Sequence, residues 1–416
     1  MLLSTGQPIN NAAGARDNMP TDADVVVVGG GSTGCSILYN LAKEGIRNAV
    51  LIDKAGQVGA GQTSRSTALV RTHYTVETVA KMALLSYHFF KNFGRNLPGR
   101  TGGYVETGLI IGAGEDAGGA LKTNVQMLNG LGIESNMIDG DEARRLEPRL
   151  DTSAFEEMVY EPHAGYAEPT TTAAAFAGAA AELGAEVRTG TRLLKLERSG
   201  QGYTLQTSAG PIQAEKVVLA TGVWSKPIFA SLGIDIPIKA ARHPVAEFKR
   251  PEEYRGKRPV VLDIARASYY KPEGGFILFV GSLELELDIS SEEVDPDNYN
   301  EGISFEEVER FSTVTAGAIP VMGEKGVHMR GYAGVYDNTP DQQPIIDHLS
   351  AYGYDNLYCL VGLSGHGFKL SPEYGRIMAS MVVDGRFKDY DVSIFKLSRF
   401  DEGKLLSSRY KVGTIG

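Results

Sequence analysis

The sequence predicts an α/β (α+β) protein in which a parallel sheet with helices is combined with a second, mostly antiparallel sheet. Two observations predict this class. A β-branched apolar run at residues 23–28 enters a glycine-rich turn, and a helix at 35–44 and a second apolar strand at 48–53 follow. Between residues 233 and 332, short apolar segments alternate with polar turns. The first pattern is typical of parallel sheets, and the second favours antiparallel pairing.

The turn after the first strand reads Gly29-Gly30-Gly31-Ser32-Thr33-Gly34. In such a turn the first glycine permits the tight bend, the second lets a pyrophosphate approach bare backbone, and the third lets helix and strand pack closely. Asp53 ends the second strand, where an acid about 20 residues after the turn binds the ribose of an adenosine. The unit therefore predicts a Rossmann-type dinucleotide site with phosphates at a helix N-terminus.

Length and charge restrict the function classes. A chain of 416 residues with 42% hydrophobic residues can build two packed domains. The net charge of −10 argues against a nucleic-acid partner, because phosphate binding requires clustered basic residues. A small anionic substrate remains compatible, since it needs only one or two cations.

Cysteine content and hydropathy exclude further classes. The chain has 2 cysteines, so neither a disulfide framework nor a cysteine metal site is predicted, and Cys35 is expected to be a small buried side chain. We expect no metal site. No run of 18 apolar residues predicts a membrane span. Residues 1–21 lack the apolar core of a signal peptide and are expected to form a disordered leader on a cytoplasmic protein.

Elements of the nucleotide-binding domain recur later in the chain. Residues 170–183 predict an alanine-rich helix, and strands are expected at 186–197, 203–207 and 215–220. The last strand enters the turn Ala220-Thr221-Gly222, which Trp224 follows. We expect a final helix after Ser371-Pro372, a good N-cap and first-turn pair.

Several segments in this order resemble the D-amino-acid oxidase superfamily of flavoproteins, in particular its sarcosine oxidase and dimethylglycine dehydrogenase branch. The resemblance runs from Asp24 to about Gly385. Its carriers are the polar, glycine-rich stretch 59–67, the turn at 220–222, and the segments Leu69-Val70-Arg71-Thr72-His73-Tyr74, Val335-Tyr336-Asp337-Asn338-Thr339-Pro340-Asp341 and Ser364-Gly365-His366-Gly367-Phe368-Lys369-Leu370-Ser371.

The resemblance implies an FAD-binding domain made from separate pieces, into which a substrate domain is inserted whose sheet covers the flavin. The FAD-binding pieces are expected at 22–98, 163–232 and 333–395, and the substrate-domain pieces at 99–162 and 233–332. The implied FAD contacts come from Gly29, Gly31, Ser32, Thr33, Gly34, Asp53, Lys54, Thr63, Ser64, Arg65, Ser66, Thr67, Val187, Thr221, Gly222, Trp224, Gly365, His366, Gly367, Phe368 and Lys369.

The resembled oxidases bind the substrate carboxylate with an arginine and a lysine, which implies these roles for Arg71 and Lys369. A guanidinium can hold a carboxylate through two charge-assisted hydrogen bonds of about 1.5–3 kcal/mol each. Tyr336 and, by a looser match, Tyr270 correspond to active-site tyrosines near the substrate amine. For Tyr270 a core position is an equal alternative. His73 and His366 are given structural roles, His366 within the flavin loop.

The sequence departs from these relatives at two positions. Gly334 stands where monomeric sarcosine oxidases attach FAD to a cysteine, so non-covalent FAD is predicted. Ile277 and Gly281 stand where the oxidases carry an O2-activating lysine and a histidine. Whether O2 or another carrier accepts the electrons therefore stays open, with a slight preference for a dehydrogenase.

The predicted reaction is oxidation of the C–N bond of a small amino acid by hydride transfer to FAD, followed by imine hydrolysis. An N-methyl or other secondary amine such as sarcosine is the preferred substrate. A cyclic or D-amino acid, such as proline, hydroxyproline or pipecolate, and a flavoprotein subunit that works with a partner are the alternatives. A homo- or hetero-oligomer is compatible with either.

Overall fold

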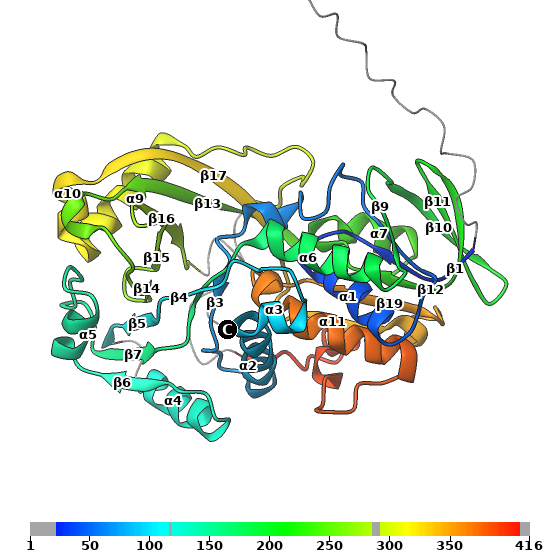
Figure 1. The fold of residues 1–416 in the computed structure, drawn as a ribbon, viewed down its shortest axis with the longest axis horizontal. Coiled ribbons are helices and arrows are strands. Elements are labelled where there is room, and N and C mark those ends of the chain that lie inside the picture. The colour runs from blue at the N-terminus through cyan, green and yellow to red at the C-terminus, as the bar shows by residue number, and fades with distance from the viewer. Residues whose placement is uncertain (1–21, 116–118, 285–291, 408–416) are drawn as a thin grey trace, which may run out of the picture.

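The computed structural model describes residues 22–115, 119–284 and 292–407, so the predicted leader at 1–21 lies outside the described residues. Two eight-stranded sheets and one three-stranded sheet form its framework. One large sheet lies with most of the helices at one end of the molecule, and the other occupies the opposite end (Figure 1).

The first sheet contains the predicted strand–helix–strand unit. β1 (Asp22–Val28) leads into α1 (Ser32–Lys43), and β2 (Ala49–Ile52) pairs parallel with β1. The strand order is β10-β11-β12-β1-β2-β9, with β19 beside β12 and β18 beside β19. The added strands are β9 (Glu186–Arg188), β10 (Leu193–Ser199), β11 (Gly202–Thr207), β12 (Gly210–Leu219), β18 (Ile345–His348) and β19 (Leu357–Val361). The strand predicted at 186–197 is thus two strands.

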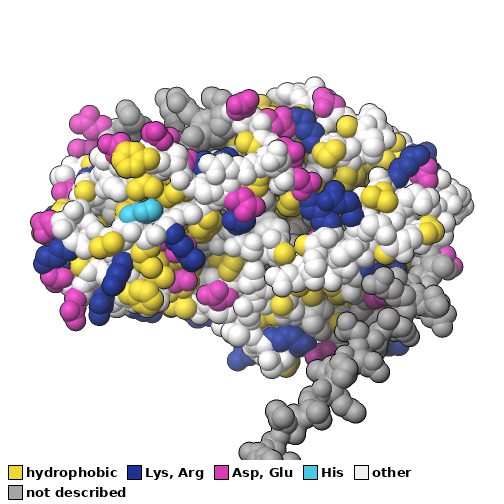
Figure 2. All heavy atoms as spheres, turned by 90° about the horizontal axis from the view of Figure 1, so that it is seen from above, with side chains coloured by type: hydrophobic (Ala, Val, Ile, Leu, Met, Phe, Trp, Pro, Cys, Tyr) yellow, Lys and Arg dark blue, Asp and Glu magenta, His cyan; other side chains and the backbone are white. Residues whose placement is uncertain are grey.

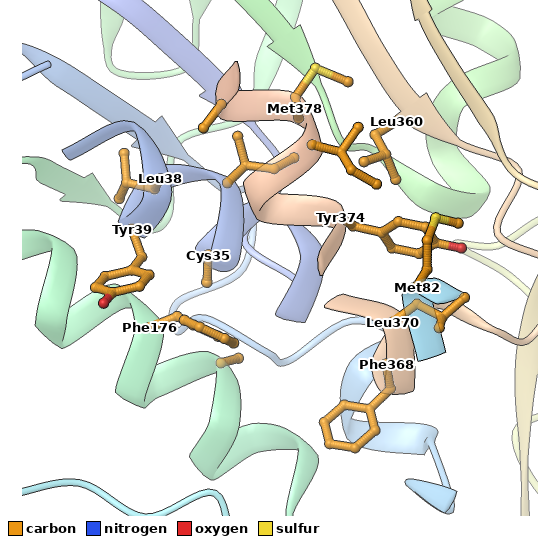
Figure 3. Packing of buried hydrophobic residues seen from close by; sticks show 14 of the residues in the cluster. Cys35, Leu38, Tyr39, Met82, Phe176, Leu360, Phe368, Leu370, Tyr374 and Met378 are labelled. Atoms are coloured by element: carbon orange, nitrogen blue, oxygen red, sulfur yellow. The ribbon is translucent and has the colours of Figure 1, made fainter. Parts of the chain in front are cut away.

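Helices α1, α2 (Glu77–Lys91), α6 (Pro169–Glu182) and α11 (Gly367–Asp384) pack against one another beside this sheet. Their shared core includes Cys35, Phe176, Phe368 and Tyr374 (Figure 3). The thiol of Cys35 is fully buried, which confirms its predicted structural role, and this burial raises its pKa. Alanine side chains let α6 lie close to α1, because they add little volume to the interface.

The second sheet has the order β17-β13-β16-β15-β14-β5-β7-β6 and is antiparallel except between β14 and β5, which confirms the predicted antiparallel character. Its strands are β5 (Leu109–Ala113), β6 (Asn136–Ile138), β7 (Glu157–Glu161), β13 (Lys239–Lys249), β14 (Val260–Asp263), β15 (Ser268–Glu273), β16 (Ile277–Ser282) and β17 (Val327–Asn338). β3 (Leu69–Val70), β8 (Gly165–Tyr166) and β4 (Val105–Glu106) form the small sheet.

The remaining helices are α3 (Phe93–Asn96), α4 (Ala120–Gly130), α5 (Gly140–Leu146), α7 (Ser225–Ser231), α9 (Phe305–Ala318) and α10 (Pro320–Lys325). α9 and α10 pack on one face of the second sheet around Phe311. Within the described ranges, no helix is long and apolar enough to cross a membrane. On the face in Figure 2, basic and acidic side chains are interspersed without a continuous basic area.

Two boundaries differ from the expected ones. β17 stays paired with β13 up to Asn338, so the chain leaves the second sheet after the boundary expected at residue 333. The last helix begins at Gly367 rather than after Ser371, and Pro372 lies inside it. As the sixth residue of the helix, Pro372 has no N–H to donate to the carbonyl oxygen of Phe368, so one intrahelical hydrogen bond is missing there. The first turn of α11 therefore includes Lys369.

Candidate active site

The glycine turn before α1 makes a cradle that side chains would fill. Gly29 has a φ of +112°, and a Cβ there would lie 2.3 Å from the carbonyl oxygen of Ala220. A Cβ on Gly34 would lie 1.8 Å from the oxygen of Gly29, and one on Gly31 would lie 3.1 Å from Oγ1 of Thr63. Bare backbone at these positions fits the pyrophosphate of a dinucleotide.

A cavity extends from this turn along the edge of both large sheets. Its lining consists of Gly29, Gly31, Ser32, Thr33, Asp53, Gly61, Gln62, Thr63, Arg65, Ser66, Ala220, Thr221, Gly222, Val223, Trp224, Gly334, Val335, Tyr336, Asp337, Leu363, Gly365, Gly367 and Phe368. Two helix N-termini, those of α1 and α11, reach this cavity and favour negative charge in it.

Fourteen of the predicted cofactor residues line this cavity, and seven do not. Thr67 and Lys369 line a second cavity, described below, and Gly34 packs against Gly29.

The other four predicted residues have different surroundings. Lys54 forms an ion pair with Asp297 and lies 4.0 Å from the Trp224 ring centre. The hydroxyl of Ser64 donates to backbone oxygens of its own turn. Val187 lies in β9 opposite Leu51. His366 is fully buried and occupies the N-cap position of α11, where its side chain makes no capping hydrogen bond.

A second, smaller cavity brings the predicted carboxylate anchors together. Its lining consists of Ser66, Thr67, Ala68, Leu69, Arg71, Leu262, Tyr269, Leu283, Tyr336, Gly365 and Lys369. Arg71 follows β3, and Lys369 belongs to the first turn of α11. Residues almost 300 positions apart in the sequence therefore share one cavity.

Arg71 and Lys369 are two cations in the wall of one cavity, Arg71 buried and Lys369 half-buried. Arg71 is 4% exposed, donates to the carbonyl oxygen of His73 and lies 4.1 Å from the ring centre of Tyr74. Lys369 donates to the carbonyl oxygen of Gly365 at 3.1 Å. Burial, and then the charge of Arg71, hold the pKa of Lys369 well below its usual value. An anion between the two would stabilise both charged forms.

Tyr336 lies where the cavities meet. It lines both of them and also a third, which His243 and Tyr269 share. The ring of His243 stacks on Tyr336 with 3.8 Å between ring centres. Sequence reasoning missed His243, because its approach to Tyr336 follows from the register of β13 against β17.

Tyr270 does not join this group; of the two positions expected for it, near the substrate or in the core, it takes the core position. It is fully buried on the opposite face of the second sheet, and its hydroxyl donates to the carbonyl oxygen of Val314 in α9 at 3.0 Å. Side chains alternate along a strand, so the neighbouring Tyr269 faces the cavities instead. Tyr269 is 6% exposed, and burial raises its pKa to about 12.

A family model described as FAD dependent oxidoreductase, DAO, matches residues 24–381. The chain belongs to the DAO family. Monomeric sarcosine oxidase of Bacillus sp. strain B-0618 is 25% identical to it, over 92% of this chain and 97% of that protein. Human mitochondrial sarcosine dehydrogenase is 28% identical, over 96% of this chain and 44% of that protein. L-proline dehydrogenase from P. horikoshii has a TM-score of 0.84 at 26% identity, covering 93% of this chain and 100% of that structure.

Membership in the DAO family makes the protein an FAD-dependent amino-acid or amine oxidoreductase. The glycine cradle and the two helix N-termini fit this cofactor. No cysteine lines the large cavity, since Cys35 and Cys359 are both buried in the core. Within the described part of the chain, no group of three or more His, Cys, Asp or Glu residues could hold a metal ion.

Asp337 is a buried acid in the wall of the cofactor cavity. Burial raises its pKa to about 6, although the backbone N–H groups of Gly362, Leu363 and Ser364 lower it. These donors belong to the loop before α11, whose Ser364 N–H also donates to the backbone carbonyl oxygen of Asp337 in β17 at 3.3 Å.

His73 has the structural surroundings that the sequence suggested. Its ring is fully buried, with Nε2 at 3.0 Å from Nδ2 of Asn124 and Nδ1 at 3.7 Å from Oε1 of Glu161. Glu161 also accepts from the backbone N–H of Thr72 at 3.2 Å. These contacts fix the backbone next to Arg71.

Proposed function

We propose that this DAO-family protein oxidises the C–N bond of a small amino acid, with an N-methyl or other secondary amine as the preferred substrate. FAD supplies the hydride acceptor, and the resulting imine hydrolyses in water. The residues of the chain bind the carboxylate, orient the amine and exclude water from the reacting carbon.

The observation that carries the proposal is that two cations, the buried Arg71 and the half-buried Lys369, line one cavity. No carboxylate of the described residues forms an ion pair with Lys369, whose charge is disfavoured where it lies. A substrate carboxylate would offset this cost and accept hydrogen bonds from both groups. Charge-assisted hydrogen bonds of this kind contribute about 1.5–3 kcal/mol each.

Three aromatic side chains form the other side of the substrate cavity. Tyr336 and Tyr269 line it directly, and His243 supports Tyr336 by stacking. An amino acid held by its carboxylate would place its amine against these rings, which attract partial positive charge. We propose that Tyr269 takes the role first assigned to Tyr270. Arg71 and Lys369 recognise the carboxylate of the substrate, and the tyrosines recognise its amine. None of these residues needs to act as a base when the amine binds in its neutral form.

A cyclic amino acid is the second candidate, and one observation favours it. L-proline dehydrogenase from P. horikoshii has a TM-score of 0.84, and this chain covers all of that structure. Proline is itself a secondary amine with a free carboxylate, so the same anchors would serve. The two candidates differ only in the volume required beside the amine.

The identity of the electron acceptor depends on other residues than the identity of the substrate does. Gly281 pairs with Tyr269, and a Cβ there would lie 2.4 Å from the tyrosine ring, so no larger side chain fits beside the cavity at this position. The buried Lys271 is close to the cavity, but its ammonium group is already paired, because it donates to the carbonyl oxygen of Thr67 at 2.8 Å and forms an ion pair with Glu273. We propose that the acceptor is a carrier other than O2. Faster re-oxidation by O2 than by an artificial acceptor would contradict this.

The function is tested by anaerobic bleaching of the bound flavin with a panel of N-methyl, cyclic and D-amino acids. The Arg71→Met and Lys369→Met variants are each expected to raise KM about 30-fold or more, the value of one charge-assisted hydrogen bond of about 2 kcal/mol. Lys388→Met, which removes only an exposed pair with Asp384, is the matched control. Unchanged KM in both anchor variants would exclude the proposed carboxylate site.

A second measurement tests how FAD is held. With Gly334 at the matching position and no cysteine in the cavity, we expect acid precipitation to release all FAD into the supernatant. Yellow colour that stays with the precipitated protein would disprove non-covalent binding.

A further inference from the structure

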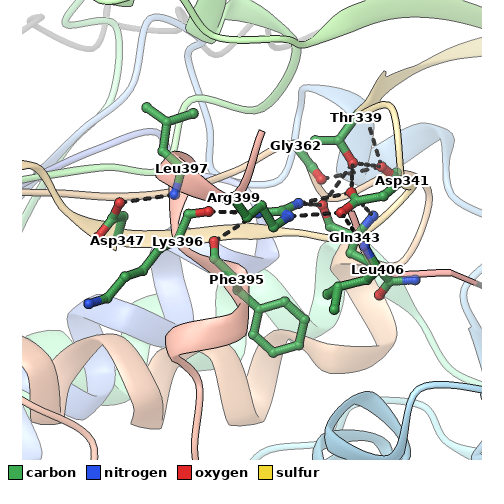
Figure 4. A network of polar contacts seen from close by, with 11 residues as sticks. Thr339, Asp341, Gln343, Asp347, Gly362, Phe395, Lys396, Leu397, Arg399 and Leu406 are labelled. Carbon is green, nitrogen blue, oxygen red and sulfur yellow. Dashed lines mark hydrogen bonds and ion pairs between the residues drawn. The ribbon is translucent and has the colours of Figure 1, made fainter. Parts of the chain in front are cut away.

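A buried ion pair joins the C-terminal segment to the loop that follows β17. Arg399, in the short helix η7 (Leu397–Arg399), is 4% exposed. Its Nε and Nη2 atoms donate to the two carboxylate oxygens of Asp341 at 2.8 and 2.9 Å (Figure 4). Such bidentate pairing fixes orientation as well as distance.

The other hydrogen-bonding groups of this pair are also satisfied. Arg399 donates to the carbonyl oxygens of Phe395 and Gln343, each at 2.9 Å. Asp341 also accepts the backbone N–H of Leu406 at 3.2 Å. The C-terminal segment is therefore tied to the 339–343 loop from both ends, by Arg399 and by Leu406.

The 339–343 loop is in turn hydrogen-bonded to the turn before α11. The hydroxyl of Thr339 donates to Oδ1 of Asp341 at 3.1 Å. The backbone N–H of Thr339 donates to Oγ of Ser364, also at 3.1 Å. Ser364 is fully buried and has a φ of +46°, a conformation that a non-glycine residue adopts only when its surroundings enforce it. The hydrogen bond from Thr339 supplies part of that enforcement.

The turn leads directly to the active site. Gly365 follows Ser364, lines both the cofactor cavity and the substrate cavity, and accepts the hydrogen bond of Lys369. We propose that Arg399 is a positioning residue for the active site, which acts through Asp341 to fix this turn. It touches neither cavity, and it lies beyond residues 24–381, the part of the chain that the family model matches.

The expected effect of Arg399 on FAD binding follows from the family alone. Its expected effect on carboxylate binding rests on the proposed function. Two binding measurements separate them. FAD affinity is measured with the apoprotein, and carboxylate affinity is measured with the holoprotein by the change that sodium acetate causes in the flavin spectrum. Neither requires turnover.

Arg399→Met is expected to raise the Kd of FAD about tenfold or more, because it leaves the Asp341 carboxylate buried without its partner. It is expected to raise the Kd of acetate about fivefold, since Gly365 and Lys369 lose their fixed geometry. Thr339→Val removes only the middle hydroxyl and is expected to raise both constants about threefold. The measurements are made well below the melting temperature of each variant.

Arg376→Met is the matched control. Arg376 lies on α11 and forms a bidentate pair with the buried Glu373 at 2.6 and 2.9 Å, but its partners do not line either cavity. This variant is expected to lower Tm and to leave both Kd values unchanged within about twofold. If Arg399 only stabilised the fold, Arg399→Met would likewise lower Tm and leave both Kd values unchanged.

Unchanged FAD affinity in both Arg399→Met and Thr339→Val would overturn the proposal, as would equal losses in Arg376→Met. If Arg399→Met does not fold, Thr339→Val alone decides. A wild-type protein that binds FAD but neither acetate nor any amino acid would refute the proposed function. The FAD measurements would still decide the role of Arg399.

Discussion

The glycine turn before α1 and the sheet face around Tyr336 both line the cofactor cavity, but they are built differently. The turn is made within six consecutive residues, and its demands concern backbone: positive φ at Gly29 and no Cβ on Gly34. The sheet face is made from β13, β15 and β17, and its residues meet only through strand register.

The difference teaches where an active site can be recognised. A site made from backbone tolerates few substitutions, because a Cβ collides with main-chain atoms that cannot move aside. A site made from side chains on neighbouring strands depends on which face each residue takes. One step along β15 exchanges Tyr269 in the cavity for Tyr270 in the core.

The largest expected effect is at the turn. In Gly34→Ala the new Cβ would lie 1.8 Å from the oxygen of Gly29, so α1 must move away from β1. We expect loss of FAD binding and a lower yield of folded protein, measured by flavin content and Tm. Gly56→Ala is the control, since no atom lies within 4 Å of its Cβ position. A Gly34→Ala protein with full FAD content would show that the turn is less constrained than its geometry indicates.

The next effect concerns pH. The pKa of Lys369 is lowered by burial and by Arg71, and carboxylate binding favours its protonated form. The Kd of acetate should therefore be lowest below the pKa of Lys369 and rise as pH increases through it, by at most about tenfold per pH unit.

Lys369→Arg serves as the comparison, because a guanidinium stays charged over this range. Its acetate affinity should be independent of pH, and that of Lys369→Met should be weak and equally independent. A wild-type profile that stays flat over the whole pH range in which the holoprotein is folded would assign the carboxylate site to Arg71 alone.

The smallest effects are expected from substitutions of the two neighbouring tyrosines, Tyr269 and Tyr270. Tyr269→Phe should raise KM several-fold, because its hydroxyl lies beside the substrate cavity and Thr67. Tyr270→Phe should leave kinetics unchanged and reduce the free energy of unfolding by about 1 kcal/mol, the value of its hydrogen bond to Val314. Steady-state kinetics and denaturant unfolding of both variants measure this. The reverse pattern would show that the register of β15 differs in solution.

The sequence by itself determined the local parts of this protein: the first strand–helix–strand unit, the glycine turn, Asp53 and the alanine-rich α6. Periodicity and glycine positions express these directly, because each involves residues close in the chain. The sequence also indicated Arg71, Lys369 and Tyr336 as candidate site residues. They lie in motifs that resemble a family whose model matches residues 24–381.

Only the tertiary structure decided how those residues meet. It put Tyr269 rather than Tyr270 in the cavity, stacked His243 on Tyr336, and started α11 at Gly367 so that Lys369 lies in its first turn. It also connected Arg399 to the turn at Ser364 through Asp341. Strand register and long-range ion pairs depend on the packing of distant segments, which no local pattern specifies.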